Sequence, residues 1–293
     1  MSAVWIIVGL LSIILIAFGG VLAHDADKKV KTDNSNAPLA YFIGMLTNFF
    51  DTLGIGSFAP TTALLKFTKA IDERVMPGTL NVSCTMPVIV EAIIFIQVVK
   101  VDILTLVLLI VASVIGSYLG AAIMSKMPKK QVKMVMGVAL IIIAFFLFAG
   151  QMGWIANLGS GDALGLTGSK LIIGIIVFFV LGTLMSAGVG LYAPAMATVY
   201  LLGMSPLVAF PIMMGACAFL MPVGSYKFIK ENAYAPKVSL FISLGGIIGV
   251  IFATNVVTSL PLQVLTYVVI CVVIITGVIM FVEAVKMKKG EII

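Results

Sequence analysis

Nine long apolar runs occupy most of this 293-residue chain, and they constrain its fold more than any other feature. A helix needs about 20 apolar residues to cross a hydrocarbon core about 30 Å thick. Only 10% of the residues are charged, against about 25% in soluble domains. The composition therefore excludes an ordinary soluble enzyme, a disordered chain and a nucleic-acid-binding protein, and it predicts an all-α polytopic membrane protein. The apolar runs cover residues 4–23, 38–65, 75–99, 103–125, 131–150, 170–202, 206–229, 238–256 and 261–284.

The polar stretches between these runs predict the domain boundaries. The first run is expected to stay in the protein as a membrane helix, because no Lys or Arg precedes it as one would in a signal peptide. A glycine-rich stretch without lysine at residues 151–169 is expected to join two halves. The predicted divisions are an extra N-terminal transmembrane helix at 1–23, a cytoplasmic loop at 24–37, a first repeat at 38–150, an extracytoplasmic linker at 151–169, a second repeat at 170–285 and a cytoplasmic tail at 286–293.

The two halves carry matching motifs in the same order, which indicates an internal duplication. The matched pairs are Gly54–Pro60 with Gly188–Pro194, Pro77 with Pro211, Gly116 and Gly120 with Gly245 and Gly249, and Pro128 with Pro261. The first two pairs are each separated by 134 residues. Glycines spaced four apart are typical of close helix packing in membranes, so the third pair is given a packing role.

The placement of Lys and Arg predicts that two runs turn back inside the membrane. If all nine runs crossed with the N-terminus outside, the 18 cationic residues would divide 11 inside and 7 outside. If 38–65 and 170–202 each return to their starting side, the division is 16 inside and 2 outside, which the positive-inside bias favours. Each half then has one re-entrant helical hairpin and three membrane helices, so the repeats are inverted. A full crossing of 170–202 remains open, because its first arm would reach ~27 Å.

The two glycine turns are the candidate anion site. Each is followed by a proline that is expected to stand first in a short helix. Unpaired N–H groups and the dipole at such a helix start attract anions, and glycine lets an anion approach the backbone. The alternative is that the glycines only permit tight helix packing or a turn. The candidate binding residues are Thr52, Gly54, Gly56, Ser57, Pro60, Thr79, Asn81, Ser83, Gly188, Gly190, Tyr192, Pro194 and Gly215.

The first turn and the later run Met76-Pro77-Gly78-Thr79-Leu80 resemble the first-repeat signature of the TauE/SafE family, the sulfite exporters also grouped as the 4-toluene sulfonate uptake permease family. The second turn fits the same pattern, and Gly215 stands where the second half would carry the Gly-Thr pair. The likeness covers about residues 39–285. It implies a permease or exporter of sulfite, sulfonates or related sulfur-containing organic anions.

Two carboxylates, Asp51 and Glu91, lie inside apolar runs. An ionised group there costs about 2.5–3.5 kcal/mol on insertion scales and is normally functional or paired. For Asp51 two hypotheses remain open: it carries a coupling H⁺ or Na⁺, or it is a structural partner of a half-helix N-terminus. Glu91 is expected to be structural, near the outer surface and attracted by Lys100. Pro87 is expected to break its helix.

These features predict a secondary transporter of small anions in the plasma membrane, with the N-terminus outside and the C-terminus cytoplasmic. An anion channel of the same fold is the alternative. The chain has no Gly-x-x-x-x-Gly-Lys-Ser/Thr loop, and its single histidine, His24, is placed in a loop, so neither an ATPase nor a serine–histidine enzyme is expected. The expected partners are a small anion, lipid and a coupling H⁺ or Na⁺, with a homo-oligomer left open and no cofactor, metal or nucleic acid.

Overall fold

The computed structural model describes residues 3–29, 35–97, 100–154, 161–188, 190–256 and 262–287 of the chain. Within those residues every helix or strand element is a helix, which confirms the predicted fold class. The elements are α1 (Ala3–Lys29), α2 (Ala37–Thr52), α3 (Phe58–Thr68), η2 (Glu73–Val75), α4 (Met76–Phe95), α5 (Ile103–Met124), α6 (Lys129–Gln151), α8 (Gly168–Met185), α9 (Tyr192–Leu201), η3 (Pro206–Val208), α10 (Ala209–Lys230), α11 (Pro236–Val256) and α12 (Leu262–Lys286).

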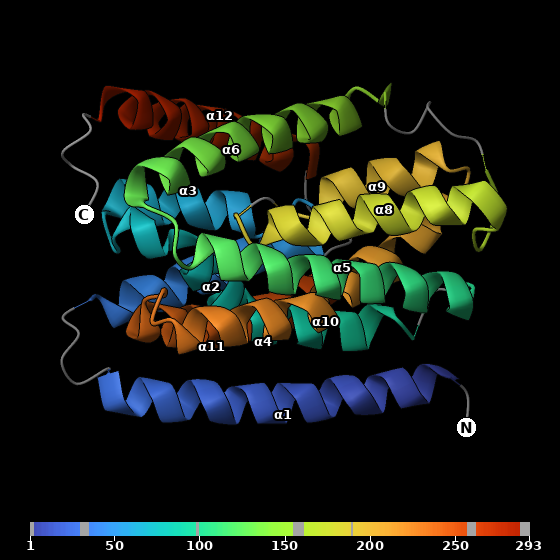
Figure 1. Cartoon of the computed structure of the whole chain (residues 1–293), viewed down its shortest axis with the longest axis horizontal. Coiled ribbons are helices and arrows are strands. Elements are labelled where there is room, and N and C mark those ends of the chain that lie inside the picture. Colours follow the sequence, from blue (N-terminus) through green and yellow to red (C-terminus); the bar gives the residue numbers. More distant parts are fainter. Residues whose placement is uncertain are drawn as a thin grey trace.

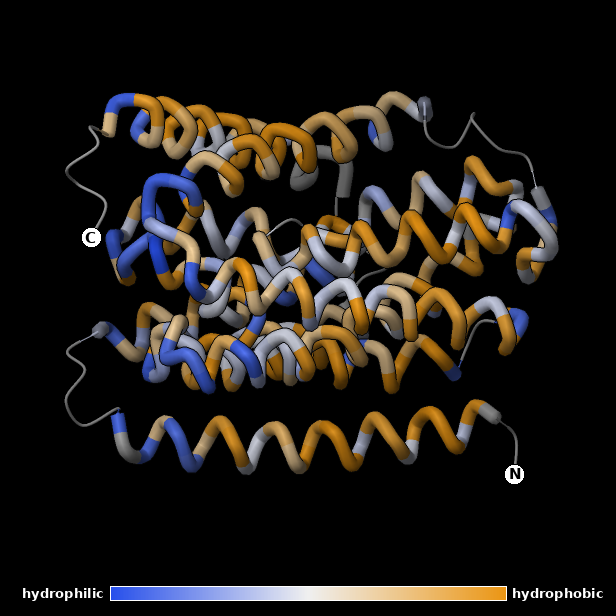
Figure 2. Tube along the Cα trace, in the orientation of Figure 1, coloured by the Kyte–Doolittle hydropathy of each residue, from blue (hydrophilic) through white to orange (hydrophobic). Residues whose placement is uncertain are grey.

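The helices form a bundle in which the long axes run roughly together (Figure 1). By length and composition, seven helices of the described residues could cross a membrane: α1, the segment containing η2 and α4, α5, α6, α8, α10 and α11. Figure 2 shows apolar residues along the middle of the bundle and hydrophilic residues gathered toward its ends. This distribution is the one a membrane protein requires, and it confirms the predicted class.

The N-terminal helix is longer than the sequence predicted. It continues through His24 to Lys29, so the loop expected at 24–37 begins later. Beyond the apolar run, polar contacts stabilise the added turn: the ammonium of Lys29 lies 2.8 Å from Asp25 one turn earlier, and the Tyr234 hydroxyl donates to Asp25. Parts of three predicted connections, at 30–34, 155–160 and 288–293, lie outside the described residues.

Each glycine turn separates a longer helix from a short one. The first turn joins α2 to the 11-residue α3, and the second joins α8 to the 10-residue α9. Gly54, Gly56 and Gly188 have φ angles of 82°, 91° and 88°. Glycine adopts this left-handed region without the steric penalty of a Cβ, which explains why the repeated motif begins with glycine.

Both hairpins return to the end of the bundle where they began. Ahead of α8, Ala163 forms an isolated β-bridge with Met204, which follows α9, and the Ser205 N–H donates to the Ala163 carbonyl at 2.9 Å. Figure 1 shows α3 at one end of the bundle and α9 at the opposite end. The described part of 170–202 is therefore a returning hairpin and not one continuous helix.

The contacts between helices keep their pattern when the two halves are exchanged. α2 packs on α11 as α8 packs on α5, and α4 packs on α11 as α10 packs on α5. Likewise α3 packs on α12 as α9 packs on α6, while α4 meets α10 and α6 meets α12. A Cβ on Gly116 or Gly120 would overlap the α8 backbone, and one on Gly245 or Gly249 would overlap the α2 backbone. The predicted packing role of these glycines is confirmed.

The predicted helix break at Pro87 is wrong, because α4 continues through this residue. Proline has no N–H, so the carbonyl of Ser83 one turn earlier loses its helical donor. The Ser243 hydroxyl of α11 donates to that carbonyl at 2.7 Å. A neighbouring helix thus replaces the missing hydrogen bond and keeps α4 intact.

Candidate functional site

A small cavity lies between the two hairpin tips. Its volume is about 20 Å³, which is room for about one water molecule. Both hairpins and three further helices contribute to its wall. The lining residues are Asp51, Ile55, Gly56, Ser57, Phe58 and Ala59 from the first hairpin, Met185, Gly190, Leu191 and Tyr192 from the second, and Val88, Ile143 and Cys217 from α4, α6 and α10.

The N-termini of α3 and α9 both face this cavity. Pro60 and Pro194 stand third in these helices, not first as predicted. The third position also tolerates proline, because the N–H groups of a first helical turn have no intrahelical acceptor. The first intrahelical bond of α3 runs from the Thr61 N–H to the Ser57 carbonyl at 3.0 Å. Three N–H groups ahead of each proline are therefore left without a helical partner.

The two helix starts differ in what they bond. The Ser57 N–H donates to Asp51 Oδ1 at 2.7 Å, so the carboxylate of α2 occupies the start of α3. At the same offset of 134 residues, Met185 and Leu191 replace Asp51 and Ser57. A thioether is at best a weak acceptor, and among the described residues no acceptor contacts the Leu191 N–H. Of these two helix starts, the described residues place a carboxylate at α3 and none at α9.

Glu91 is a second buried acid beside the site. Its Oε2 accepts a hydrogen bond from the Tyr192 hydroxyl at 2.8 Å, and its side chain is fully buried. Its hydrogen-bond partner is Tyr192 and not the expected Lys100, which is exposed. Val88, three residues earlier on α4, lines the cavity, so Glu91 lies close to it.

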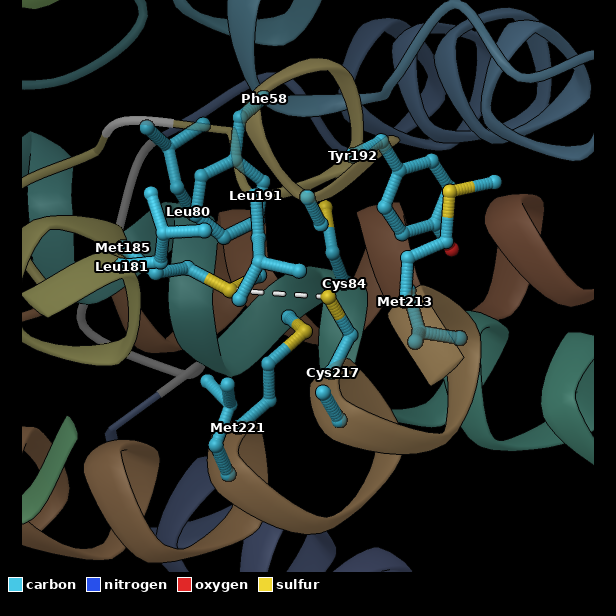
Figure 3. Packing of buried hydrophobic residues seen from close by; sticks show 14 of the residues in the cluster. Phe58, Leu80, Cys84, Leu181, Met185, Leu191, Tyr192, Met213, Cys217 and Met221 are labelled. Carbon is cyan, nitrogen blue, oxygen red and sulfur yellow. Dashed lines mark hydrogen bonds between the residues drawn. The ribbon is translucent and has the colours of Figure 1, made fainter. Parts of the chain in front are cut away.

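Sulfur-containing side chains form part of the wall. Figure 3 shows Phe58, Leu191 and Tyr192 from the two turns lying around Cys84 and Cys217. The Cys217 thiol lies 3.7 Å from the Met185 thioether. Buried thiols and thioethers pack as adaptable apolar groups, so these residues give the cavity an apolar wall opposite its backbone N–H groups.

The structure brings five of the predicted site residues together at the cavity: Asp51, Gly56, Ser57, Gly190 and Tyr192. The other candidates lie outside its lining. They are Thr52, Gly54, Pro60, Thr79, Asn81, Ser83, Gly188, Pro194 and Gly215.

Local hydrogen bonds and packing explain why several of these residues are elsewhere. The side chains of Thr52, Thr79 and Asn81 each donate to a carbonyl four residues earlier in the same helix. This is the common alternative for hydroxyl and amide groups in membrane helices. Gly215 packs against α5, where a Cβ would lie 3.4 Å from Ile110. Proximity to a glycine turn in the sequence therefore predicted more site residues than the cavity contains.

From the cavity, α3 leads to a cluster of ion pairs at one end of the bundle. Lys66 at the end of α3 contacts both Glu73 and Glu283. Lys133 of α6 lies 2.6 Å from Glu283 and 3.1 Å from Glu73. The cluster joins α3, η2, α6 and the last turns of α12. Nine crossings would put Lys66 and the end of α12 on opposite faces, so these pairs agree with the returning hairpin.

The apolar bundle, its two broken-helix hairpins and the cavity between their tips define a polytopic membrane protein of the transporter class. Residues 2–147, about half of the chain, match the family described as Sulfite exporter TauE/SafE. The chain belongs to this family, and the match includes the first glycine turn. Comparisons with curated proteins and with solved structures gave no match.

Proposed function

We propose that this protein is a secondary transporter of small anions, either sulfite or sulfonates and related sulfur-containing organic anions. The anion binds at the N-terminus of α9, where Gly190, Leu191 and Tyr192 face the cavity. This uncapped helix start is the observation that carries the proposal. Its free N–H groups and helix dipole favour an oxyanion, and membership of the sulfite exporter family indicates a sulfur oxyanion.

The start of α3, the equivalent helix of the first half, already binds an anionic group, and this supports anion binding at the start of α9. There, the carboxylate of Asp51 accepts the Ser57 N–H at 2.7 Å. A sulfite or sulfonate oxygen has the same acceptor character as a carboxylate oxygen. Asp51 therefore models the contact that an external anion makes at α9, and its bond favours the structural hypothesis for this residue over a coupling role.

An inverted repeat accounts for how such a site is reached from two sides. The exchange of helix contacts between halves and the hairpins at opposite bundle ends support this arrangement. Rocking of one half against the other then exposes the central cavity alternately. The ion-pair end, which collects Lys66, Lys129 and Lys133, is the cytoplasmic end by the positive-inside bias.

Transport of labelled sulfite and methanesulfonate into liposomes containing the purified protein tests the proposal. We expect saturable flux, accelerated by an imposed pH or Na⁺ gradient and inhibited by the other sulfur anion. Protein-free liposomes and acetate are the controls. Unitary currents in planar bilayers would identify the channel alternative, and absence of protein-dependent flux for both anions would refute the assignment.

A further inference from the structure

One carboxylate oxygen of Glu91 is buried without a hydrogen-bond partner among the described residues. Its Oε2 accepts the Tyr192 hydroxyl, but its Oε1 has no hydrogen-bond partner among the described residues and is buried. The ion pairs of the described residues do not include Glu91 or Asp51. An ionised carboxylate in this setting would be an uncompensated buried charge, which proteins avoid by neutralising the group.

A comparison of the two buried acids assigns the proton to one of them. Asp51 accepts a backbone N–H at the start of a helix, a contact that stabilises the ionised form. Glu91 has only a neutral phenol as donor. Asp51 and Tyr192 both line the cavity, and Tyr192 is bonded to Glu91, so the two acids lie near each other and repel when both are charged. A neutral Glu91 avoids both the cost of an unpaired buried charge and the repulsion from Asp51.

The other titratable groups near Glu91 do not compensate a charge on it. Cys217 of α10 and Tyr192 of α9 are ordinarily neutral near pH 7. On α1 and α3, Asp25 and Lys66 are engaged in ion pairs with other residues. Ser243 of α11 donates to a carbonyl of α4.

We propose that Glu91 is a proton-binding site of the transport cycle, occupied while the anion lies at the start of α9 and linked to that anion by Tyr192. The inference rests on the proposed function. Binding forms an O–H bond at Oε1 with a proton taken from water, and release returns that proton to water; Tyr192 keeps its own proton throughout. A neutral Glu91 does not repel the arriving anion, so one proton and one anion move together.

Infrared spectroscopy of the full-length protein in liposomes locates the proton without any ligand. At neutral pH we expect the carbonyl stretch of a protonated carboxyl group, which disappears in Glu91→Gln and persists in Asp51→Asn. Tyr192→Phe should keep this band but shift its frequency, because the hydrogen bond from the phenol is lost. Absence of the band in the wild type, its persistence in Glu91→Gln or its loss in Asp51→Asn would overturn the proposal. If Glu91→Gln does not fold, an unshifted band in Tyr192→Phe decides against it.

Flux measurements then separate this inference from the proposed function. Methanesulfonate is the probe, since it stays an anion across the pH range used. An inward proton gradient should accelerate wild-type uptake and leave the Glu91→Gln rate unchanged, while Asp51→Asn keeps the acceleration. Equal acceleration in Glu91→Gln would refute the proton site alone. A wild type that shows the expected infrared band but carries no sulfur anion would refute the proposed function and leave the proton site standing.

Discussion

Asp51 and Met185 occupy equivalent positions 134 residues apart, and they make the two hairpin tips chemically different. The carboxylate at the first tip bonds the Ser57 N–H, whereas the thioether at the second lies against Cys217. The sequence places Asp51 beside a glycine turn, so its proximity to the site could be predicted. Its bond could not, because a contact across six residues depends on the φ angles of the intervening glycines.

We expect loss of this cap to destabilise the protein. Asp51→Ala leaves the buried Ser57 N–H without an acceptor, so the free energy of unfolding should fall by about 1–2 kcal/mol. Asp51→Asn retains an acceptor oxygen and should lose less. Thermal unfolding of the detergent-solubilised variants measures the difference, with Asp162→Ala in the linker as the control. An alanine variant as stable as the wild type would show that the hydrogen bond contributes nothing.

Glu91 illustrates the limit of sequence analysis for a site residue. An acid within an apolar run can be recognised as exceptional. Its partner Tyr192 lies 101 residues away in the other half, and only the packing of α4 beside the second hairpin brings the two together. The position of Glu91 along its helix, counted from Pro77, predicts a depth in the membrane but cannot identify the residue that contacts it.

At the scale of elements, the sequence predicted which segments are helical better than how their ends are formed. The apolar runs correspond to the helices, and glycine locates both turns. The proline positions, the continuity of α4 and the length of α1 differed, because each depends on hydrogen bonds from other elements. The bond from Ser243 to the Ser83 carbonyl is the clearest case, since it joins residues 160 apart.

Asp102 provides a test of helix capping at a membrane boundary. Its carboxylate accepts the N–H and hydroxyl of Thr105 at 2.8 and 2.7 Å, and these bonds lower the pKa of the Asp102 carboxyl. A carboxyl group whose pKa is lowered by folding stabilises the protein at pH values above its ordinary pKa. That stabilisation is lost as the pH falls through the folded-state pKa. Asp102→Ala should therefore reduce the free energy of unfolding by about 0.5–2 kcal/mol at neutral pH.

The same deficit should shrink in acid, where the wild-type carboxylate is protonated. Melting temperatures of wild type and Asp102→Ala, compared at neutral and acidic pH, provide the measurement. Asp102→Asn is the matched variant, because it can cap the helix without titrating. A deficit that stays constant with pH would mean that the charge of Asp102 does not stabilise α5.

At the scale of the whole molecule, the distribution of lysines predicted the two hairpins. The returning arm α3 places Lys66 against Glu283 of α12, and at the other end Met204, which follows α9, pairs with Ala163 ahead of α8. The exchange of helix contacts adds what the sequence lacked, namely which helices of one half pack on which of the other. Motif order reveals a duplication, but pairing between halves depends on long-range contacts.

The proposed inverted repeat predicts which lysines share a side of the membrane. With the native cysteines replaced, single cysteines at Lys69 and Lys130 should react only with a reagent supplied from the cytoplasm. Cysteines at Lys100 and Lys170 should react only from outside. Labelling of Lys69→Cys from outside, in cells with an intact membrane, is incompatible with a first hairpin that returns to the cytoplasm.

The central claim is that the anion contacts the backbone at the start of α9, and Gly190 tests it most directly. A Cβ there would point into open space, 3.9 Å from Ile143, and its backbone φ is not in the left-handed region. Gly190→Val should therefore fold while filling the cavity. Gly54→Ala is the matched control, because it strains a turn at φ 82° without lining the cavity.

Isothermal titration of sulfite into the purified proteins is the measurement. We predict that Gly190→Val weakens binding at least about tenfold, equivalent to about 1.4 kcal/mol, with an unchanged melting temperature. Gly54→Ala should lower the melting temperature and keep the wild-type affinity. Wild-type affinity in folded Gly190→Val would contradict the account, since an anion at the start of α9 cannot share that space with a valine side chain.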